Sequence, residues 1–185
     1  MNILEIPITS FWEGFIHPIL GVDHLLAMVS VGVISAIISQ NAIWIIPASF
    51  VCAMALGGAI GLAGFGVLGA EFWIAVSLVV LSLAISFGEK KLSKNTDIST
   101  FVTMLFVASF GIAHGNAHGL EIPQTSDPMQ FSIGFLIGTS ALHVLGVGLG
   151  KISLMFALCA TGLRITGLFA ASYGVGLIVR YLGRL

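Results

Sequence analysis

The sequence predicts an all-α protein, a polytopic bundle of six transmembrane helices, and three observations support this fold class. Of the 185 residues, 57% are hydrophobic and only 8% are charged, whereas a soluble domain carries about 25% charged residues. The mean hydropathy of +1.09 leaves too few polar groups to cover a surface that faces water. The 23 glycines suit a membrane bundle, because glycine lets helix backbones approach closely. A water-soluble globular domain and a disordered chain are therefore excluded.

The charged residues divide the chain into apolar spans of about 20 residues, the length that one crossing needs. No Asp, Glu, Lys or Arg occurs between Asp23 and Glu71, and this stretch is long enough for two crossings divided at Gln40. Polar segments at 89–97 and 120–129 separate the spans that follow. We expect one membrane domain, 1–185, with spans at about 18–39, 42–65, 72–87, 98–117, 130–160 and 165–182.

The C-terminal third is harder to divide, because Lys151 and Arg164 interrupt it with only 12 residues between them. Twelve residues are too few for a crossing, so the fifth span is extended across Lys151 to residue 160. A seventh span is the alternative. In the six-span division Lys151 lies inside a span, and the sequence offers no physical reason for it.

Lysine and arginine positions predict the orientation of the bundle. Lys90, Lys91 and Lys94 follow the third span, so this connection is expected in the cytoplasm and the N-terminus outside. No Lys or Arg precedes Lys90, which argues against a signal peptide. Arg180 and Arg184 fall outside in this arrangement, and a seventh span would place them inside. The expected location is a bacterial-type inner membrane.

Small residues predict how the helices pack. Glycines recur four residues apart in Gly57-x-x-x-Gly61, Gly134-x-x-x-Gly138 and Gly146-x-x-x-Gly150, a spacing typical of close helix contacts.

Cys52 and Cys159 lie in apolar runs and are expected to fill the core without forming a disulfide. The net charge of −1 gives no electrostatic footprint for nucleic acid.

All five histidines lie in or beside the spans, where ionisable groups are costly and indicate function. The first cluster reads HPILGVDH from His17 to His24. On a regular helix these two rings face the same way within about 20°, and Asp23 points roughly 100° away. Either the backbone around Pro18 and Gly21 is irregular, or Asp23 has another partner. A hydrogen bond from Asp23 to the second nitrogen of a ligand histidine is one such role.

The second cluster reads HGNAHGLE. His114 and His118 are four residues apart and share a helix face, and Glu121 joins them within about 60° if the helix continues. Nearby glycines and Pro123 favour an earlier end of the helix, which would take Glu121 off this face. The alternative for Glu121 is a solvated acid in a loop.

Counting crossings places both clusters at the same end of the bundle. His143 lies about 13 residues into the fifth span, which is roughly 20 Å deeper in the membrane than the end that carries the clusters. It is expected to be a ligand, and the alternative is a histidine that only packs in the core. Imidazoles with carboxylates suit Zn, Cu, Fe, Ni or Co and do not suit Mg or Ca. Met28, one turn below His24, more simply packs in the core. The expected metal ligands are His17, Asp23, His24, His114, His118, Glu121 and His143.

The two motifs together resemble the HupE/UreJ family of membrane proteins. The family's first motif, H-x5-D-H, is matched by His17, Asp23 and His24. Its second motif, H-G-x-A-H-G-x-E, is matched from His114 to Glu121. The similarity covers nearly the whole chain, and it implies that His17, Asp23, His24, His114, His118 and Glu121 matter for metal uptake.

Members of this family accompany hydrogenase and urease, which are nickel enzymes, and are regarded as permeases for nickel and in some cases cobalt. The resemblance implies a secondary permease, not an enzyme, with Ni²⁺ or Co²⁺ as substrate and no resident cofactor. Its partners would be the metal ion and lipid, and a homo-oligomer or a cytoplasmic metallochaperone stays open. Many members begin with a signal peptide and a histidine-containing leader, and this sequence begins directly with Met1.

Two other functions remain open from the residues alone. A membrane metal hydrolase lacks support because no HExxH signature occurs, and a histidine-box oxidase usually needs more than the five histidines present. A haem-binding electron carrier would take axial histidines from two helices.

Overall fold

The computed structural model describes residues 5–38, 43–88 and 96–184, and this part of the chain forms seven helices and no strand. The predicted all-helical class is confirmed. The helices are α1 (Glu5–Leu20), α2 (Val22–Ile38), α3 (Ile45–Leu62), α4 (Ala70–Phe87), α5 (Thr96–Leu120), α6 (Pro128–Met155) and α7 (Ala157–Leu182).

Five helices, α3 to α7, are long and apolar enough to cross a membrane. Residues 9–20 of α1 and the whole of α2 pass the same test only as a pair, bent by 80° at their junction. The described residues therefore give five spans, or six when the bent pair counts as one crossing. This agrees with the six-span polytopic bundle, and the seventh helix arises from a break inside the first span.

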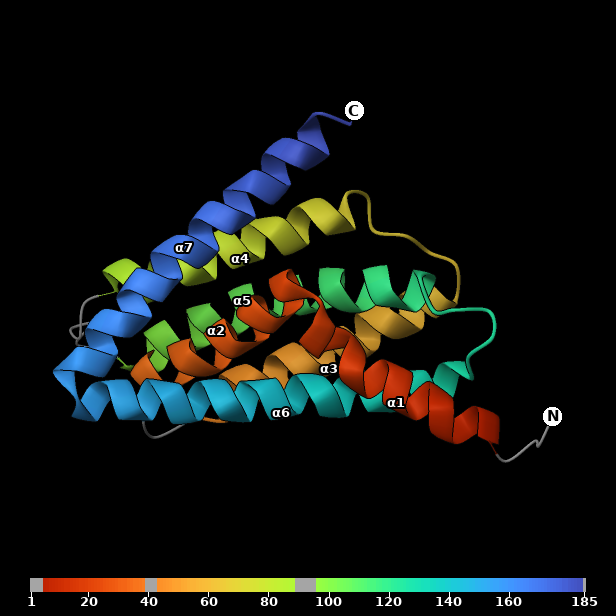
Figure 1. Ribbon diagram of the computed structural model, residues 1–185, viewed down its shortest axis with the longest axis horizontal. Coiled ribbons are helices and arrows are strands. Elements are labelled where there is room, and N and C mark those ends of the chain that lie inside the picture. Colours follow the sequence, from red (N-terminus) through yellow and green to blue (C-terminus); the bar gives the residue numbers. More distant parts are fainter. Residues whose placement is uncertain (1–4, 39–42, 89–95, 185) are drawn as a thin grey trace.

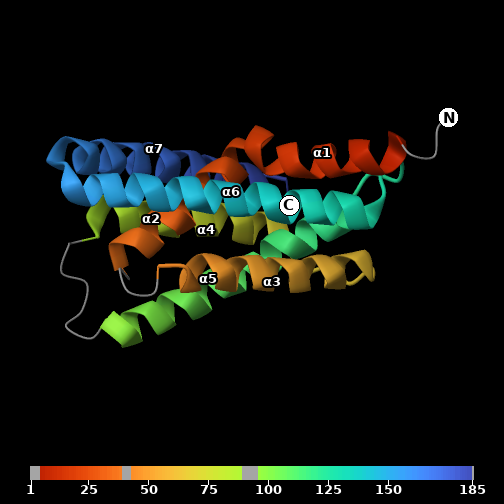
Figure 2. The same cartoon turned by 90° about the horizontal axis from the view of Figure 1, so that it is seen from below.

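The helices lie in layers, with α2 and α4 between α1, α6 and α7 on one side and α3 and α5 on the other (Figure 2). Phe50, Met28 and Met54 are fully buried in the centre, so Met28 packs as expected. Large apolar side chains such as Phe101 and Phe169 are exposed on the outer faces, as a lipid-facing surface requires.

Glycines bring neighbouring helices into backbone contact, as their spacing predicted. A Cβ added at Gly57 would overlap the main chain of Ile112 on α5, and one at Gly146 would overlap that of Val29 on α2. The other glycines of the three spacings also meet atoms of a neighbouring helix.

Cys52 and Cys159 are free but exposed, so the prediction that they lie in the core is wrong.

The first helix break differs from the predicted span 18–39. Pro18 lies inside α1, and the helix is interrupted three residues later at Gly21. A Cβ at Gly21 would lie 2.8 Å from Nδ1 of His24 and 3.2 Å from Oδ1 of Asp23. A side chain at this position would therefore force His24 or Asp23 to move from its place over the junction.

The boundary between the last two helices also differs, since spans at 130–160 and 165–182 were expected. Phe156 adopts an extended conformation (φ −125°, ψ 120°), so α6 ends at Met155 and α7 begins at Ala157. α6 begins cleanly, because Oδ1 of Asp127 accepts the backbone N–H of Gln130 at 2.8 Å.

Because α6 ends at Met155, Lys151 lies near the end of a helix and not in the middle of a membrane span. This explains a charge that the sequence alone did not explain. Lys151 is exposed in the last turns of α6, and Arg164 is exposed two turns into α7, so both lie near the same hairpin. In Figure 1 that hairpin forms the left-hand end, whereas α1 and the connection between α5 and α6 lie towards the right. Charged residues thus gather at an end of the bundle.

Candidate metal site

Two half-helices meet at Gly21 and place three of the expected residues at their junction. His17 lies in the last turn of α1, and Asp23 and His24 lie in the first turn of α2. The ring centroids of His17 and His24 are 6.2 Å apart. These rings meet because the chain bends by 80°, and not because they share a face of one helix. The backbone here is irregular, which was one of the two alternatives for Asp23.

Asp23 orients the imidazole ring of His24. The Nδ1 atom of His24 lies 2.8 Å from Oδ1 of Asp23, which also accepts the backbone N–H of His24 at 3.0 Å. A carboxylate acceptor holds the ring proton on Nδ1, so Nε2 carries the free electron pair. Metal-binding histidines are commonly oriented by a carboxylate in this way.

His118 of α5 faces His24 across the junction. Their Nε2 atoms are 2.7 Å apart and their ring centroids 4.5 Å apart. Since Nε2 of His24 accepts, the ring of His118 donates. The His118 ring also lies 4.8 Å from that of His17 and 4.7 Å from that of Phe135. Three of the predicted ligands therefore converge from both motifs.

His114 lies one turn deeper on α5, and its ring centroid is 5.5 Å from that of His24. Its Nδ1 donates to the carbonyl oxygen of Phe110 at 3.1 Å. Its Nε2 is buried and has no hydrogen-bond partner among the described residues. The ring thus has one nitrogen fixed by the helix and one free to bind an ion.

His143 is buried in α6, and neither of its ring nitrogens has a hydrogen-bond partner among the described residues. Its ring centroid is 5.2 Å from that of Phe50, and the His114 centroid is 5.4 Å from the same phenyl ring. The rings of His114 and His143 therefore contact the same phenyl ring, and His143 lies much closer to His114 than the 20 Å suggested by its depth in the expected fifth span. Buried polar atoms usually have a hydrogen-bond partner, so the two nitrogens of His143 are exceptions among the described residues.

Glu121 lies just beyond the end of α5, since the helix stops at Leu120 as the neighbouring glycines suggested. Its Oε2 is 3.8 Å from Nδ1 of His118, and its side chain is 56% exposed. Partial burial raises the pKa of its carboxyl above the ordinary value, and the nearby charge of Glu71 acts in the same direction. Glu121 therefore lies at the rim of the cluster.

In the described part of the chain, no group of three or more His, Cys, Asp or Glu side chains is arranged to hold a metal ion as it stands. The reason is the direction of the nitrogens. Nε2 of His24 and Nε2 of His118 point at each other, while Nδ1 of His114 is engaged by its own helix. Nε2 of His114 has no hydrogen-bond partner among the described residues and is not engaged in this way.

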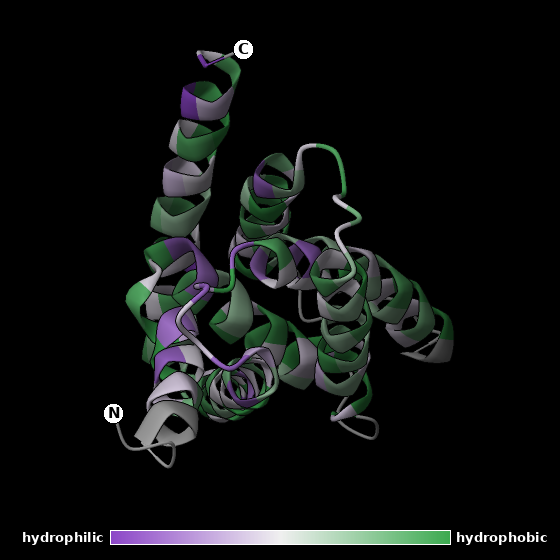
Figure 3. Ribbon diagram, turned by 90° about the vertical axis from the view of Figure 1, so that its right-hand side faces the viewer, coloured by the Kyte–Doolittle hydropathy of each residue, from purple (hydrophilic) through white to green (hydrophobic). Residues whose placement is uncertain are grey.

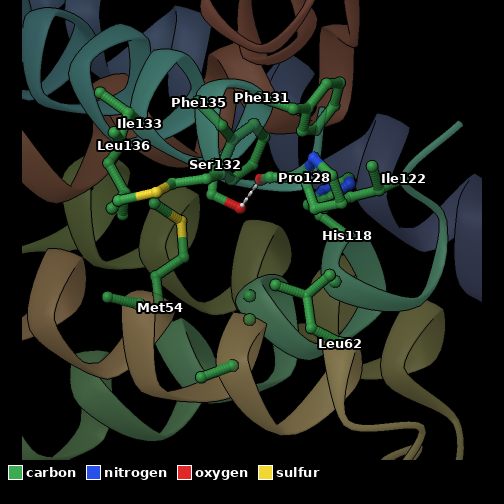
Figure 4. Close-up of a pocket in the computed structure, with 16 residues that line it drawn as sticks. Met54, Leu62, His118, Ile122, Pro128, Phe131, Ser132, Ile133, Phe135 and Leu136 are labelled. Carbon is green, nitrogen blue, oxygen red and sulfur yellow. Dashed lines mark hydrogen bonds between the residues drawn. The ribbon is translucent and has the colours of Figure 1, made fainter. Parts of the chain in front are cut away.

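Three cavities reach the cluster, and His118 lines each of them. The largest, about 790 Å³, opens beside α1 and reaches His17 and His24. A second, about 300 Å³, lies between His24 and the C-terminal end of α7. The third, about 400 Å³, is apolar and lies between α3 and α6, with the His118 ring at its edge (Figure 4).

Asn116 is a residue in the second motif whose role the sequence did not indicate. It is fully buried, and its Oδ1 accepts the backbone N–H of Val67 at 2.6 Å. Its Nδ2 donates to the carbonyl oxygen of Phe65 at 2.7 Å. Asn116 therefore ties the connection between α3 and α4 to the helix that carries His114 and His118.

Distant parts of the sequence also reach the cluster. Glu71 begins α4 and Arg180 ends α7, and both line the 300 Å³ cavity with Asp23 and His118. From the sequence, Glu71 only marks the end of a charge-free stretch, and Arg180 only bears on the orientation of the bundle. Figure 3 views this end of the molecule, where hydrophilic stretches of ribbon interrupt the largely hydrophobic helices.

The model of the HupE / UreJ protein family matches residues 4–177, which include both histidine motifs and His143. The chain belongs to the HupE/UreJ family. A relative, Protein HupE of Rhizobium leguminosarum bv. viciae, is 37% identical over 167 residues, which cover 90% of this chain and 83% of the relative. No solved structure matches the chain. Family membership and the apolar helices together make this an integral membrane protein.

Proposed function

We propose that this HupE/UreJ protein is a secondary permease for a divalent transition-metal ion, most simply Ni²⁺, used in hydrogenase or urease maturation. The observation that carries the proposal is the pair of facing Nε2 atoms of His24 and His118 at a break in a membrane helix. Membership of the family supports an accessory permease role for nickel or cobalt rather than catalysis.

A broken helix suits ion transport for a physical reason. Discontinuous membrane helices expose main-chain groups and helix ends to a bound ion near the middle of the bilayer. The C-terminal end of α1 carries partial negative charge, which favours a cation beside His17. Asp23 supplies a full negative charge, which a dication needs when it leaves water.

The distance between the two nitrogens also suits an ion. Imidazole nitrogens bind such metals at roughly 2.1 Å, so two adjacent ligands lie about 3 Å apart. The Nε2 atoms of His24 and His118 are 2.7 Å apart. An ion would replace the proton that they share and separate them by a few tenths of an ångström.

The proposed path runs from the outer cavities to the cluster, past Phe50 to His143, and on to the opposite end of the bundle. An inward-negative membrane potential favours cation entry by about 2.3 kcal/mol per charge for each 100 mV. Co²⁺ is the alternative substrate, because it takes the same ligand types. The direction of transport follows from the proposed orientation, with the cluster facing the outside of the inner membrane.

The test is uptake of radioactive Ni²⁺ by proteoliposomes that contain the full chain. We expect His24→Ala and His118→Ala to abolish saturable uptake. Ser109→Ala serves as the control, because Ser109 lies exposed on the same helix as His118 and bonds only within that helix. Uptake that persists in both histidine variants would contradict the site, and no uptake of Ni²⁺ or Co²⁺ by the unaltered protein would contradict the function.

A further inference from the structure

The 300 Å³ cavity beside the histidine pair contains two arginines, which a site for a bare cation does not need. Arg180 lies in the last turn of α7 and Arg184 two residues beyond its end, and both line the cavity with His24 and His118. Positive charge beside a cation site weakens binding of the free ion. The arginines therefore require a function of their own.

The two guanidinium groups are available for an anion. Within the described residues neither forms an ion pair, although Asp23, Glu71 and Glu121 line the same cavity. Guanidinium groups recognise carboxylates with paired hydrogen bonds of fixed geometry. The cavity volume lies at the lower end of the range for small-molecule sites, which is roughly 300 to 1,000 Å³.

The histidine pair independently indicates that the ion brings other ligands. No group of three protein ligands within the described residues is arranged to hold a metal. Two facing nitrogens leave at least two positions around a transition-metal ion to be filled from elsewhere, since such ions bind four or more ligands. A second nitrogen, Nδ1 of the 6% exposed His118, also lacks a hydrogen-bond partner beside this cavity.

We propose, on the basis of the function above, that the cavity receives the metal ion together with a small polycarboxylate ligand. Nε2 of His24 and Nε2 of His118 face the metal, and Arg180 and Arg184 hold the carboxylates. The acidic lining repels a free polycarboxylate, so the metal must be present for the ligand to bind. The protein then exchanges the carboxylates for its own histidines as the ion moves inwards.

The test uses the full-length protein in detergent micelles, with radioactive citrate and radioactive Ni²⁺ measured by equilibrium dialysis. We expect citrate to bind in the presence of Ni²⁺ and not in its absence. Arg180→Gln and Arg184→Gln should each weaken citrate binding by about 10-fold to 100-fold, as loss of a charged hydrogen bond predicts, and should not weaken Ni²⁺ binding without citrate, because each variant removes a positive charge beside the ion. Arg164→Gln is the matched control, because Arg164 lies exposed near the other end of α7.

The outcomes distinguish failure of the polycarboxylate site from failure of the permease. Binding of Ni²⁺ without any binding of citrate overturns the polycarboxylate site and leaves the permease intact. Equal effects of the arginine variants with and without citrate also overturn it, because the arginines would then act on the free ion or on lipid phosphates. Failure of Ni²⁺ to bind under either condition overturns both proposals.

Discussion

The Nδ1 atom of His24 lies 2.8 Å from Oδ1 of Asp23, and its Nε2 atom lies 2.7 Å from Nε2 of His118. One imidazole ring thus connects a carboxylate to a second imidazole across two helices. The carboxylate fixes the tautomer that leaves Nε2 able to bind an ion. The relationship joins the two sequence motifs into one site.

Substitution of Asp23 by Asn should weaken Ni²⁺ binding while the protein stays folded. The amide removes the negative charge and no longer fixes the proton on Nδ1 of His24, and loss of such a partner typically costs about 10-fold to 100-fold in metal affinity. The measurement is the apparent affinity for Ni²⁺ in uptake, with thermal stability as the control for folding. Unchanged affinity in Asp23→Asn would remove the orienting role of this carboxylate.

Gly21→Ala should disturb the contact between Asp23 and His24 without replacing either residue. The added Cβ would lie 2.8 Å from Nδ1 of His24 and 3.2 Å from Oδ1 of Asp23, so one of the two side chains must move. We expect at least about tenfold weaker Ni²⁺ uptake, comparable to loss of an orienting partner. Gly176→Ala is the control, because nothing lies within 4 Å of a Cβ at that glycine. Equal uptake by the two variants would show that the junction tolerates a side chain.

The sequence was sufficient for those parts of the site that depend on local geometry. The spacing of His114 and His118 on one helix and the count of crossings correctly brought the two motifs together. The bend at Gly21 was foreseen only as an alternative, because it depends on room left by two side chains. The contacts of Phe50 with two histidines depend on how α3, α5 and α6 pack, and no local pattern encodes them.

Gly115→Ala should destabilise the bundle rather than change the ligands directly. The added Cβ would overlap the main chain of Met54 on α3, where neither backbone can yield without shifting a helix. Overpacking of this kind costs about 1 to 3 kcal/mol. Thermal unfolding in detergent measures the effect against Gly148→Ala, a site with open space on α6. If the two variants unfold at the same temperature, the close contact of α3 with α5 does not contribute to stability.

Acidification should weaken Ni²⁺ uptake. Histidine has an ordinary pKa of about 6.5, and a protonated ring cannot bind a metal. Burial and the charge of Glu71 raise the pKa of Glu121. On acidification this carboxyl therefore takes up a proton, and loses its negative charge, sooner than the carboxyl of an exposed glutamate would. Both changes act in the same direction.

The measurement is the rate of Ni²⁺ uptake between about pH 7.5 and pH 4.5, a range that covers the ordinary titration of histidine and of a glutamate with a raised pKa. We expect a fall of at least about tenfold, and a shallower fall in Glu121→Gln, which has no carboxyl to titrate. A rate that is independent of pH would exclude neutral histidines as the ligands. Superimposable profiles for Glu121→Gln and the unaltered protein would exclude Glu121.

The proposed direction of transport can be tested through the distribution of positive charge. Lys151 and Arg164 lie near the α6–α7 hairpin, and Lys90, Lys91 and Lys94 follow α4, which runs towards the same end. Arg180 and Arg184 are at the end that carries the histidine cluster. The excess of positive charge at the hairpin end favours its placement in the cytoplasm.

Cysteine labelling in a variant with Cys52→Ser and Cys159→Ser would measure this orientation. Gln124→Cys, in the exposed connection between α5 and α6, should react with a membrane-impermeant maleimide in intact spheroplasts. Ser93→Cys, in the lysine-containing segment, should react only after permeabilisation. The opposite pattern would place the His24–His118 pair on the cytoplasmic side, where it would meet the ion last, and uptake would then have to begin at the end of the bundle that carries the α6–α7 hairpin.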